Sequence, residues 1–100
     1  MKPRERYLWL AKWAKLHGNM DVLNADLVAD YIDATGAKFA MMMYGADKCR
    51  QLGTDLSRMA SLGYLTRHRT GLEGLAGMGF PRWVWVYARG ENINLLEEQP

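Results

Sequence analysis

Hydrophobic residues recur at helical spacing near the start of the chain. Between residues 4 and 17 one face collects the apolar side chains Tyr7, Leu10, Trp13 and Ala14. Pro3 suits the first turn of a helix, and Gly18 with Asn19 suits its end. The pattern therefore predicts a helix over residues 4–17.

This helix has more apolar surface than one core contact needs, because three apolar residues lie outside the main stripe: Leu8, Trp9 and Leu16. Two interpretations remain open. The surplus is a partner interface, such as one with a second copy of the chain, or it packs beneath the acidic C-terminal segment INLLEEQP.

A second helical pattern follows a short extended stretch at residues 21–23. Asn24 suits a helix N-cap, and Thr35 with Gly36 suits the end. The expected buried face is Leu27, Val28, Tyr31 and Ile32. Three aspartates share the exposed side, Asp26, Asp30 and Asp33, where they would repel a phosphate backbone. A solvated helix face is their simpler interpretation.

The next stretch, AKFAMMMYGA, is an apolar connector that suits either an extended segment or an early helical turn. We expect its methionines, Met41 to Met43, to act as adaptable core filler rather than as a binding surface.

A third helix is predicted over residues 46–61, where apolar residues recur three and four apart: Cys49, Leu52, Leu56 and Met59. The opposite side carries Arg50, Gln51, Thr54 and Arg58, with Lys48 and Asp55 at its edge. Gly53 costs about 1 kcal/mol relative to alanine, which is tolerable where another helix crosses closely. Gly63 ends the helix.

Two strands follow, Tyr64–Thr70 and Trp83–Arg89, joined by a glycine-rich tip. Alternation places Leu65, Arg67 and Arg69 on one side of the first strand. The same alternation separates Trp83, Trp85 and Tyr87 from Val84, Val86 and Ala88. The inward face stays open, because Leu65 shares its side with two arginines.

Composition fits a single soluble domain over residues 1–100, with its core in residues 4–89 and an acidic tail at 90–100. Charge is unevenly distributed: residues 1–17, 18–43, 44–89 and 90–100 carry net charges of +4, −3, +4 and −3. A polyanion would bind where the bases gather, in the first helix and in the third helix with its hairpin.

The single cysteine, Cys49, excludes an intramolecular disulfide and a cysteine-rich zinc site. No apolar run approaches the length of a membrane span, and the first residues lead into a helix carrying Lys12 and Lys15 rather than a signal-peptide core. We therefore expect a cytoplasmic protein with no membrane contact.

The order of these elements resembles the winged helix-turn-helix family, a mainly α fold (α+β) with three helices and two to three short antiparallel strands. The resemblance covers residues 4–89 and is carried by VLNADLVADYI, DKCRQLGTDLSRMASLGYL and PRWVWVYAR. The junction DLSRMASLGYLTR looks like that of many small bacterial and phage or prophage regulators.

The resemblance implies a DNA-binding transcription regulator whose third helix enters the major groove and whose hairpin is the wing. The implied helix contacts are Lys48, Arg50, Gln51, Thr54 and Arg58. The implied wing contacts are Arg67, His68, Arg69 and Arg82. Arg50 and Gln51 suit base edges, whereas Lys48, Thr54 and Arg58 suit phosphates. A homodimer joined through the first helix would set two such helices against neighbouring half-sites of double-stranded DNA.

Two features depart from the family, namely the apolar tip GLEGLAGMGF and the aspartate side of the second helix. They favour the alternative, a winged-helix module that contacts a protein partner, for example a phage factor acting on a host protein, without binding DNA. The aromatic residues Trp9, Trp83 and Trp85 support the same alternative.

An enzyme is disfavoured. His17 and His68 lie on different elements with no evident carboxylate partner, so neither a catalytic triad nor a metal site is expected. The glycines from Gly71 to Gly79 are not followed by Lys-Ser or Lys-Thr, so the stretch fails as a phosphate loop. We expect no cofactor.

Overall fold

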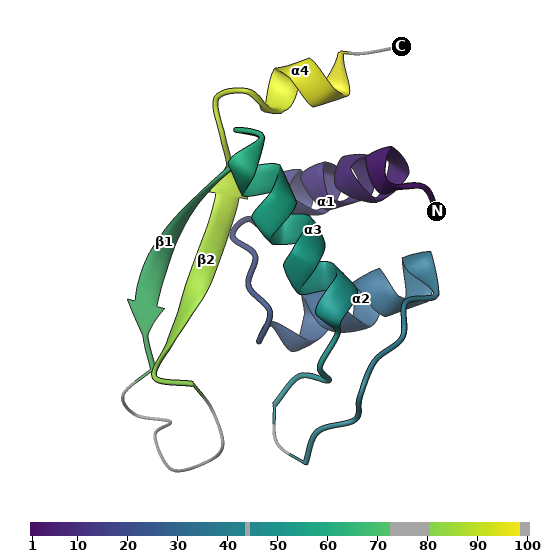
Figure 1. The fold of residues 1–100 in the computed structure, drawn as a ribbon, viewed down its shortest axis with the longest axis vertical. Helices are drawn as coiled ribbons and strands as arrows, with labels where there is room; N and C mark the ends of the chain where they lie inside the picture. The colour runs from purple at the N-terminus through teal and green to yellow at the C-terminus, as the bar shows by residue number, and fades with distance from the viewer. Residues whose placement is uncertain (44, 73–80, 99–100) are drawn as a thin grey trace.

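The computed structural model of this chain describes residues 1–43, 45–72 and 81–98, which form an α+β domain. Within these residues there are four helices and one two-stranded antiparallel sheet. Along the chain they are α1 (Pro3–His17), α2 (Ala25–Thr35), α3 (Arg50–Ser61), β1 (Leu65–Gly71), β2 (Trp83–Arg89) and α4 (Ile93–Glu97). Figure 1 shows this order along the ribbon.

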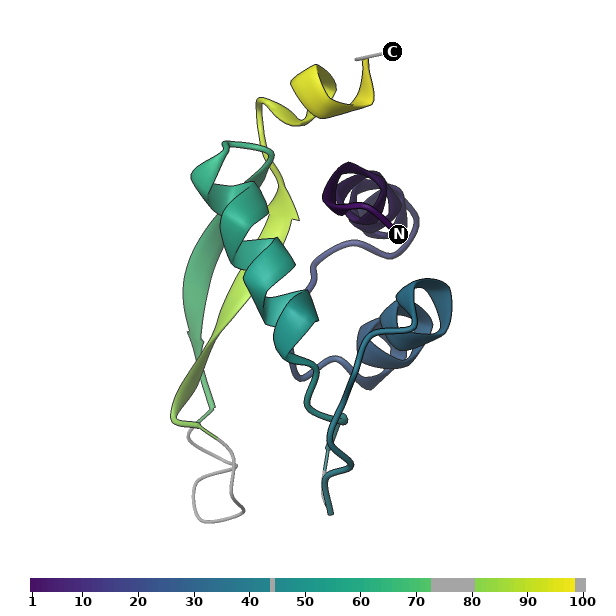
Figure 2. The same cartoon turned by 45° about the vertical axis from the view of Figure 1, so that its right-hand side comes forward.

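The third helix occupies the centre of the domain. The β1–β2 hairpin runs along one side of α3, while α1 and α2 lie on the other side (Figures 1 and 2). Completely buried side chains fill the space between these elements, among them Leu10, Leu27, Leu52, Leu56 and Met59. The packed elements cover part of α3, and the exposed side chains of this helix, Arg50, Thr54 and Arg58, remain available for contacts outside the domain.

The first two helices confirm the sequence pattern. α1 ends at His17, directly before Gly18. α2 is capped by Asn24, whose Oδ1 accepts a 3.1 Å hydrogen bond from the Leu27 amide. Gly36 ends α2 in the left-handed conformation. The local signals for start and end were sufficient here because side-chain capping and glycine conformation act within a few residues.

The extended piece expected at residues 21–23 is wrongly placed. Met20 makes the strand-like contact instead, through two backbone hydrogen bonds of 2.8 Å with Tyr87 of β2. Asp21 then turns the chain, since its Oδ1 accepts a 2.8 Å hydrogen bond from the Leu23 amide. Met20 therefore ties the link between α1 and α2 to the hairpin.

The predicted start of the third helix at residue 46 is also wrong, because α3 begins at Arg50. Lys48 and Ala40 form an isolated antiparallel bridge with hydrogen bonds of 2.8 and 2.9 Å. That pairing holds the chain extended before the helix. Cys49 is the N-cap residue and is buried, as its place on the apolar stripe predicted.

The register of the hairpin decides which face of the strands turns inward. Leu65 is paired with Arg89, Arg67 with Tyr87, and Arg69 with Trp85, so these residues share one face. Leu65 and Tyr87 on that face are buried in the core. The face that carries the arginines is therefore the inward one near α3, a point that alternation alone left open.

Gly63 makes the junction between α3 and β1. Its φ of 81° lies in the left-handed region, and a Cβ there would lie 2.6 Å from Nδ2 of Asn92. Both constraints require glycine at this position. The expected end of the third helix is confirmed.

The acidic C-terminal segment forms a helix that the sequence pattern did not predict. Ile93 and Leu96 of α4 are buried in the core, and α4 packs against α1 (Figure 1). The Arg4 guanidinium donates a 3.3 Å hydrogen bond to the Leu96 carbonyl. Packing of this segment against the first helix, one of the two interpretations left open, is thus observed.

That packing changes the expected partner interface of α1. Leu8 and Trp9 are partly buried against the core, and the Trp9 ring meets Tyr31 edge-on with centroids 5.9 Å apart. Leu16 is 69% exposed. Of the three residues, Leu16 alone retains a largely free apolar surface.

The methionine loop between α2 and α3 was expected to fill the core, and this expectation is wrong. Met41 and Met43 are 84% and 87% exposed, and Phe39 and Met42 are 48% and 49% exposed. Because the Ala40–Lys48 bridge joins the base of the loop, its central residues project away from the packed elements. This apolar loop is a surface feature.

Among the helices of the described residues, none combines the length and the apolar character that a membrane span requires.

Candidate nucleic-acid interface

The free side of α3 carries a shallow, wide-open hollow of about 600 Å³, which we call the α3 groove. Its lining consists of residues of α3 alone: Arg50, Gly53, Thr54, Ser57, Arg58 and Ser61. Three of the predicted helix contacts, Arg50, Thr54 and Arg58, are thus brought together, and all three are exposed. The groove offers two guanidinium groups and three hydroxyl groups, which are donors suited to phosphate oxygens and base edges.

Gln51, expected to read bases, lies outside this groove. It is partly buried, and its Nε2 donates a 2.9 Å hydrogen bond to the Tyr31 hydroxyl. One donor of the amide is therefore engaged within the domain, and the base contact expected of Gln51 stays a prediction.

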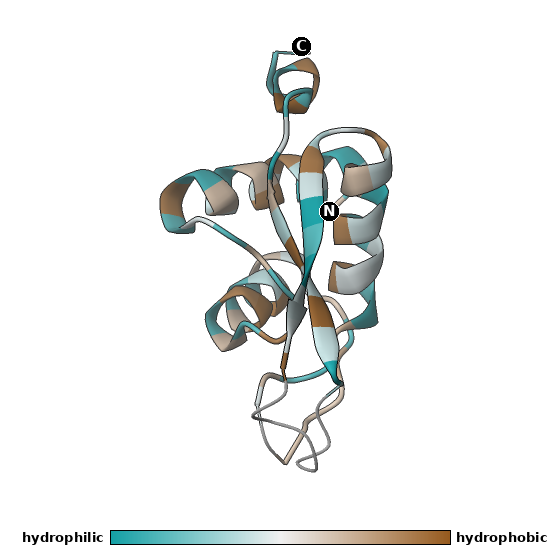
Figure 3. Ribbon diagram, turned by 90° about the vertical axis from the view of Figure 1, so that its left-hand side faces the viewer, coloured by the Kyte–Doolittle hydropathy of each residue, from teal (hydrophilic) through white to brown (hydrophobic). Residues whose placement is uncertain are grey.

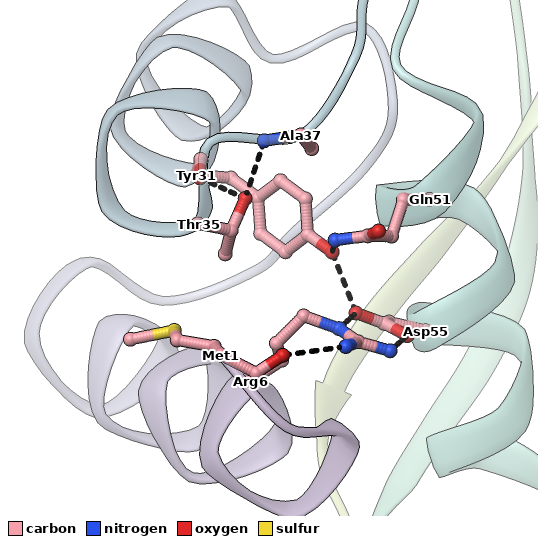
Figure 4. Close-up of polar contacts among 7 residues, drawn as sticks. All are labelled: Met1, Arg6, Tyr31, Thr35, Ala37, Gln51 and Asp55. Carbon is pink, nitrogen blue, oxygen red and sulfur yellow. Dashed lines mark hydrogen bonds and ion pairs between the residues drawn. The ribbon is translucent and has the colours of Figure 1, made fainter.

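Asp55 occupies the centre of a buried polar cluster. Its carboxylate accepts hydrogen bonds from Arg6 Nε at 2.7 Å, from Arg6 Nη2 at 3.2 Å and from the Tyr31 hydroxyl at 2.6 Å. Figure 4 shows these groups converging from α1, α2 and α3. Asp55 is 2% exposed, so its expected place at the edge of the polar side was wrong.

The cluster shifts two pKa values in the direction expected for such contacts. The hydrogen bond to Asp55 raises the pKa of Arg6. Burial, followed by the hydrogen bond to Asp55, raises the pKa of Tyr31 above its ordinary value of 10.0. Arg6 therefore stays charged and Tyr31 stays protonated near neutral pH, and together they balance the buried carboxylate.

Sequence periodicity missed this cluster because its members lie on three different helices. The available signal was weak: Asp55 borders Leu56 within an otherwise apolar flank of its helix. A buried carboxylate needs a cationic or donor partner, but its identity depends on how α1 crosses α3. The cluster holds α3 in place, and with it the groove on the opposite side of that helix.

The inward face of the hairpin carries two arginines stacked on tryptophans. The Arg67 guanidinium carbon lies 4.2 Å from the Trp85 ring centroid, and that of Arg69 lies 4.3 Å from the Trp83 centroid. The two tryptophan rings meet edge-on at 5.2 Å. Figure 3 shows the resulting hydrophilic stretch in the middle of β1. Stacking on the rings restricts the guanidinium groups, and both arginine side chains remain exposed.

The other predicted contacts are exposed but dispersed. His68 alternates with the two arginines and so lies on the opposite face of the hairpin. Arg82 lies directly before β2, where its carbonyl accepts a hydrogen bond from the Leu72 amide. Lys48 precedes α3. The structure thus places Arg67 beside α3 and Arg69 on the same face of the hairpin, and it separates His68 from both.

A second groove, of about 360 Å³, lies between α3 and the hairpin. Gly53 and Ser57 of α3 border both grooves. The hairpin side of the second groove includes Arg67, Trp83 and Trp85. The two hollows are therefore adjacent surfaces around the same turn of α3.

Several bases of this region form no ion pair with another described residue. In the part of the chain that the structure describes, the ion pairs are Arg6 with Asp55 and Arg89 with Glu97. Six bases of the α3 and hairpin region take part in neither pair: Lys48, Arg50, Arg58, Arg67, Arg69 and Arg82. We call these six residues the basic surface.

The aspartates of α2 are exposed as expected, and one of them is directed at α1. Asp30 Oδ2 accepts a 2.9 Å hydrogen bond from the Trp13 indole. Nowhere in residues 1–43, 45–72 and 81–98 do three His, Cys, Asp or Glu side chains gather as a metal site would need.

No protein-family model matches this chain, and no curated protein or solved structure shows significant similarity to it. Its function therefore has to be inferred from the residues of the interface themselves.

Proposed function

We propose that this protein is a winged-helix DNA-binding domain that acts as a transcription regulator. The observation that carries the proposal is the basic surface: six uncompensated cations lie on one helix, its N-terminal approach and the neighbouring hairpin. Arg50 and Arg58 border one groove of α3 and Arg67 borders the adjoining one, and this group of bases, in a chain of formal net charge +2, suits a polyanion.

In this proposal α3 enters the major groove and the hairpin lies along the flanking backbone. A major groove is about 12 Å wide and accepts one helix with its side chains. Arg50 lies at the start of the exposed α3 surface and Arg58 two turns further along the helix, with Thr54 between them. Arg50 is assigned to base edges, and Thr54 and Arg58 to phosphates.

The order of elements supports the winged-helix assignment. α1 is followed by the Met20 bridge to β2, then by α2, α3 and the hairpin. The buried Arg6–Asp55–Tyr31 cluster gives α3 a rigid base on the side away from the proposed DNA contact. A rigid reading helix loses less conformational entropy when it binds.

Fluorescence anisotropy of a labelled mixed-sequence duplex tests the proposal. Each phosphate contact releases counterions, so six contacts predict a fall in affinity of about 10³ between about 50 and about 200 mM salt. Absence of binding at the lower salt concentration would contradict the proposal. A weak salt dependence would show that phosphate contacts do not dominate.

The homodimer expected through α1 remains a prediction, and fewer exposed apolar residues of α1 now support it. Of its proposed contacts, Leu8 and Trp9 are partly buried in the core, and Leu16 is exposed. Sedimentation with and without DNA distinguishes a monomer from the half-site dimer.

A second candidate function is protein binding, and the exposed methionine loop favours it. Phe39, Met41, Met42 and Met43 present a flexible apolar surface of the kind that adapts to partner proteins. This candidate predicts that binding to a partner persists at high salt, because apolar contacts release no counterions.

A further inference from the structure

The groove between α3 and the hairpin has the size and lining of a ligand site. Its volume of about 360 Å³ falls within the range of about 300 to 1,000 Å³ that small-ligand sites occupy. Two tryptophans and Val22 supply apolar surface, and Arg67 and Ser57 supply polar groups. An aromatic ring with an attached anion matches this lining.

Gly53 gives independent support for a ligand that approaches the backbone of α3 closely. A Cβ built on Gly53 would lie 3.7 Å from Val22 Cγ1, an ordinary contact, so internal packing does not require glycine. Glycine weakens the helix interior, yet here it borders both grooves. Absence of a side chain keeps the backbone of α3 accessible where the two grooves meet.

The hairpin side presents planes on which a base can stack. Trp83 is 39% exposed, and its ring is nearly perpendicular to that of Trp85, with an interplanar angle of 85°. Arg67, stacked on Trp85, adds a second planar group, the guanidinium, whose N–H groups can donate hydrogen bonds to phosphate oxygens. Unpaired bases are held in proteins by stacking on aromatic rings and arginine planes.

We propose that this groove binds an unpaired nucleotide of a DNA strand that adjoins the duplex on α3. The base stacks against the face of Trp83 opposite the one that Arg69 covers, and the guanidinium groups of Arg67 and Arg69 bind the neighbouring phosphates. A strand, rather than a free nucleotide, is the occupant because the groove opens along Gly53 and Ser57 onto the basic α3 surface. This inference rests on the proposed DNA binding and extends it to duplex ends or junctions.

Anisotropy titrations compare a blunt duplex with the same duplex carrying a short single-stranded extension. Stacking of one base predicts about tenfold tighter binding of the extended duplex. Ser57→Leu fills the groove with a side chain outside the core and removes this preference. Ser61→Leu is the matched control, since Ser61 borders the α3 groove but not the hairpin groove. The control variant retains the preference.

A second pair of variants addresses the stacking surface. Trp83→Ala abolishes the preference for the extension, whereas Trp83→Phe, which keeps an aromatic plane, preserves most of it. Circular dichroism of each variant checks that the fold is retained. Equal affinity of the wild-type protein for blunt and extended duplexes would overturn the inference and leave the proposed duplex binding intact.

Further outcomes separate the inference from the proposed function. Tight binding of a single strand without binding of the blunt duplex would support the nucleotide site between α3 and the hairpin. It would contradict the proposal that α3 enters the major groove of duplex DNA. A free nucleoside monophosphate that binds as tightly as the strand would overturn the inference, because the groove would then be a small-ligand site.

Discussion

The Tyr31 hydroxyl donates a 2.6 Å hydrogen bond to Oδ2 of Asp55 and so joins α2 to α3 at a buried point of the domain. Arg6 of α1 binds the same carboxylate through two N–H groups. One aspartate of α3 therefore connects this helix to both α1 and α2. A buried carboxylate with this many donors is stable only while each partner is present.

Replacement of Asp55 by alanine should destabilise the domain strongly. It leaves the Arg6 guanidinium and the Tyr31 hydroxyl without their acceptor, and loss of a buried partner costs about 3 to 5 kcal/mol. The Arg6 side chain retains 16% exposure, so the lower end of that range, about 3 kcal/mol, is expected. Urea unfolding measures the change. The control Asp33→Ala, on an exposed position, should stay within about 0.5 kcal/mol.

The raised pKa of Tyr31 predicts a loss of stability at alkaline pH. Tyrosine in the unfolded chain ionises near pH 10, whereas Tyr31 in the folded domain stays protonated because it is buried and bonded to Asp55. The contribution of the Tyr31 hydroxyl to the free energy of unfolding is complete below pH about 10. Above that pH it decreases by up to about 1.4 kcal/mol per pH unit, because the unfolded chain loses this proton first. The stability advantage of the wild type over Tyr31→Phe should therefore shrink as pH rises, and an unchanged difference would contradict this account.

Local signals predicted the helix ends that depend on capping, but they missed boundaries that depend on contacts between distant segments. Asn24, Gly36 and Gly63 marked helix ends correctly, because capping and left-handed glycine conformations depend on neighbouring residues. The start of α3 was predicted too early, since the Ala40–Lys48 bridge is a contact between parts of the chain that periodicity does not relate. The helix in the acidic tail was missed because its five residues are too few to show a period.

The candidate interface was predictable where it depended on one element. The spacing of Arg50, Thr54 and Arg58 on a helix placed them in one groove. The hydrogen bond from Gln51 to Tyr31 was not predicted, because Tyr31 lies on another helix. The stacking of Arg67 on Trp85 required the strand register, which alternation within each strand does not supply. Contacts between elements were the part that the sequence pattern could not provide.

Arg50→Ala and Arg58→Ala should weaken binding to duplex DNA and make it less sensitive to salt. Each variant removes a cation that has no ion-pair partner among the described residues, so the slope of log affinity against log salt should fall by about 1. Arg89→Ala is the control, because Arg89 is already paired with Glu97. If all three variants gave the same slope as the wild type, the arginines of α3 would not contact phosphates.

Gly53→Ala should change stability and binding in opposite directions. Alanine favours the helix by about 1 kcal/mol, and its Cβ fits at 3.7 Å from Val22, so the free energy of unfolding should rise. The same methyl group narrows both grooves, and affinity for DNA should fall. Ser57→Ala, which improves helix propensity without added bulk, is the control for the stability effect. If the Gly53→Ala variant bound DNA with unchanged affinity, the proposal that DNA approaches the α3 backbone closely at this position would be wrong.

Leu96→Ala tests whether α4 belongs to the folded core. Leu96 is 2% exposed and packs in the cluster shared with α1, so truncation to alanine should cost about 2 to 5 kcal/mol. Leu95, its neighbour in the same short helix, is 58% exposed. Leu95→Ala should therefore change stability by less than about 0.5 kcal/mol. Chemical unfolding of the two variants gives a direct comparison, because both lose the same side-chain atoms from adjacent positions. Equal small effects would show that α4 detaches from α1 in solution, and the surplus apolar surface of α1 would then again be free for a second copy of the chain.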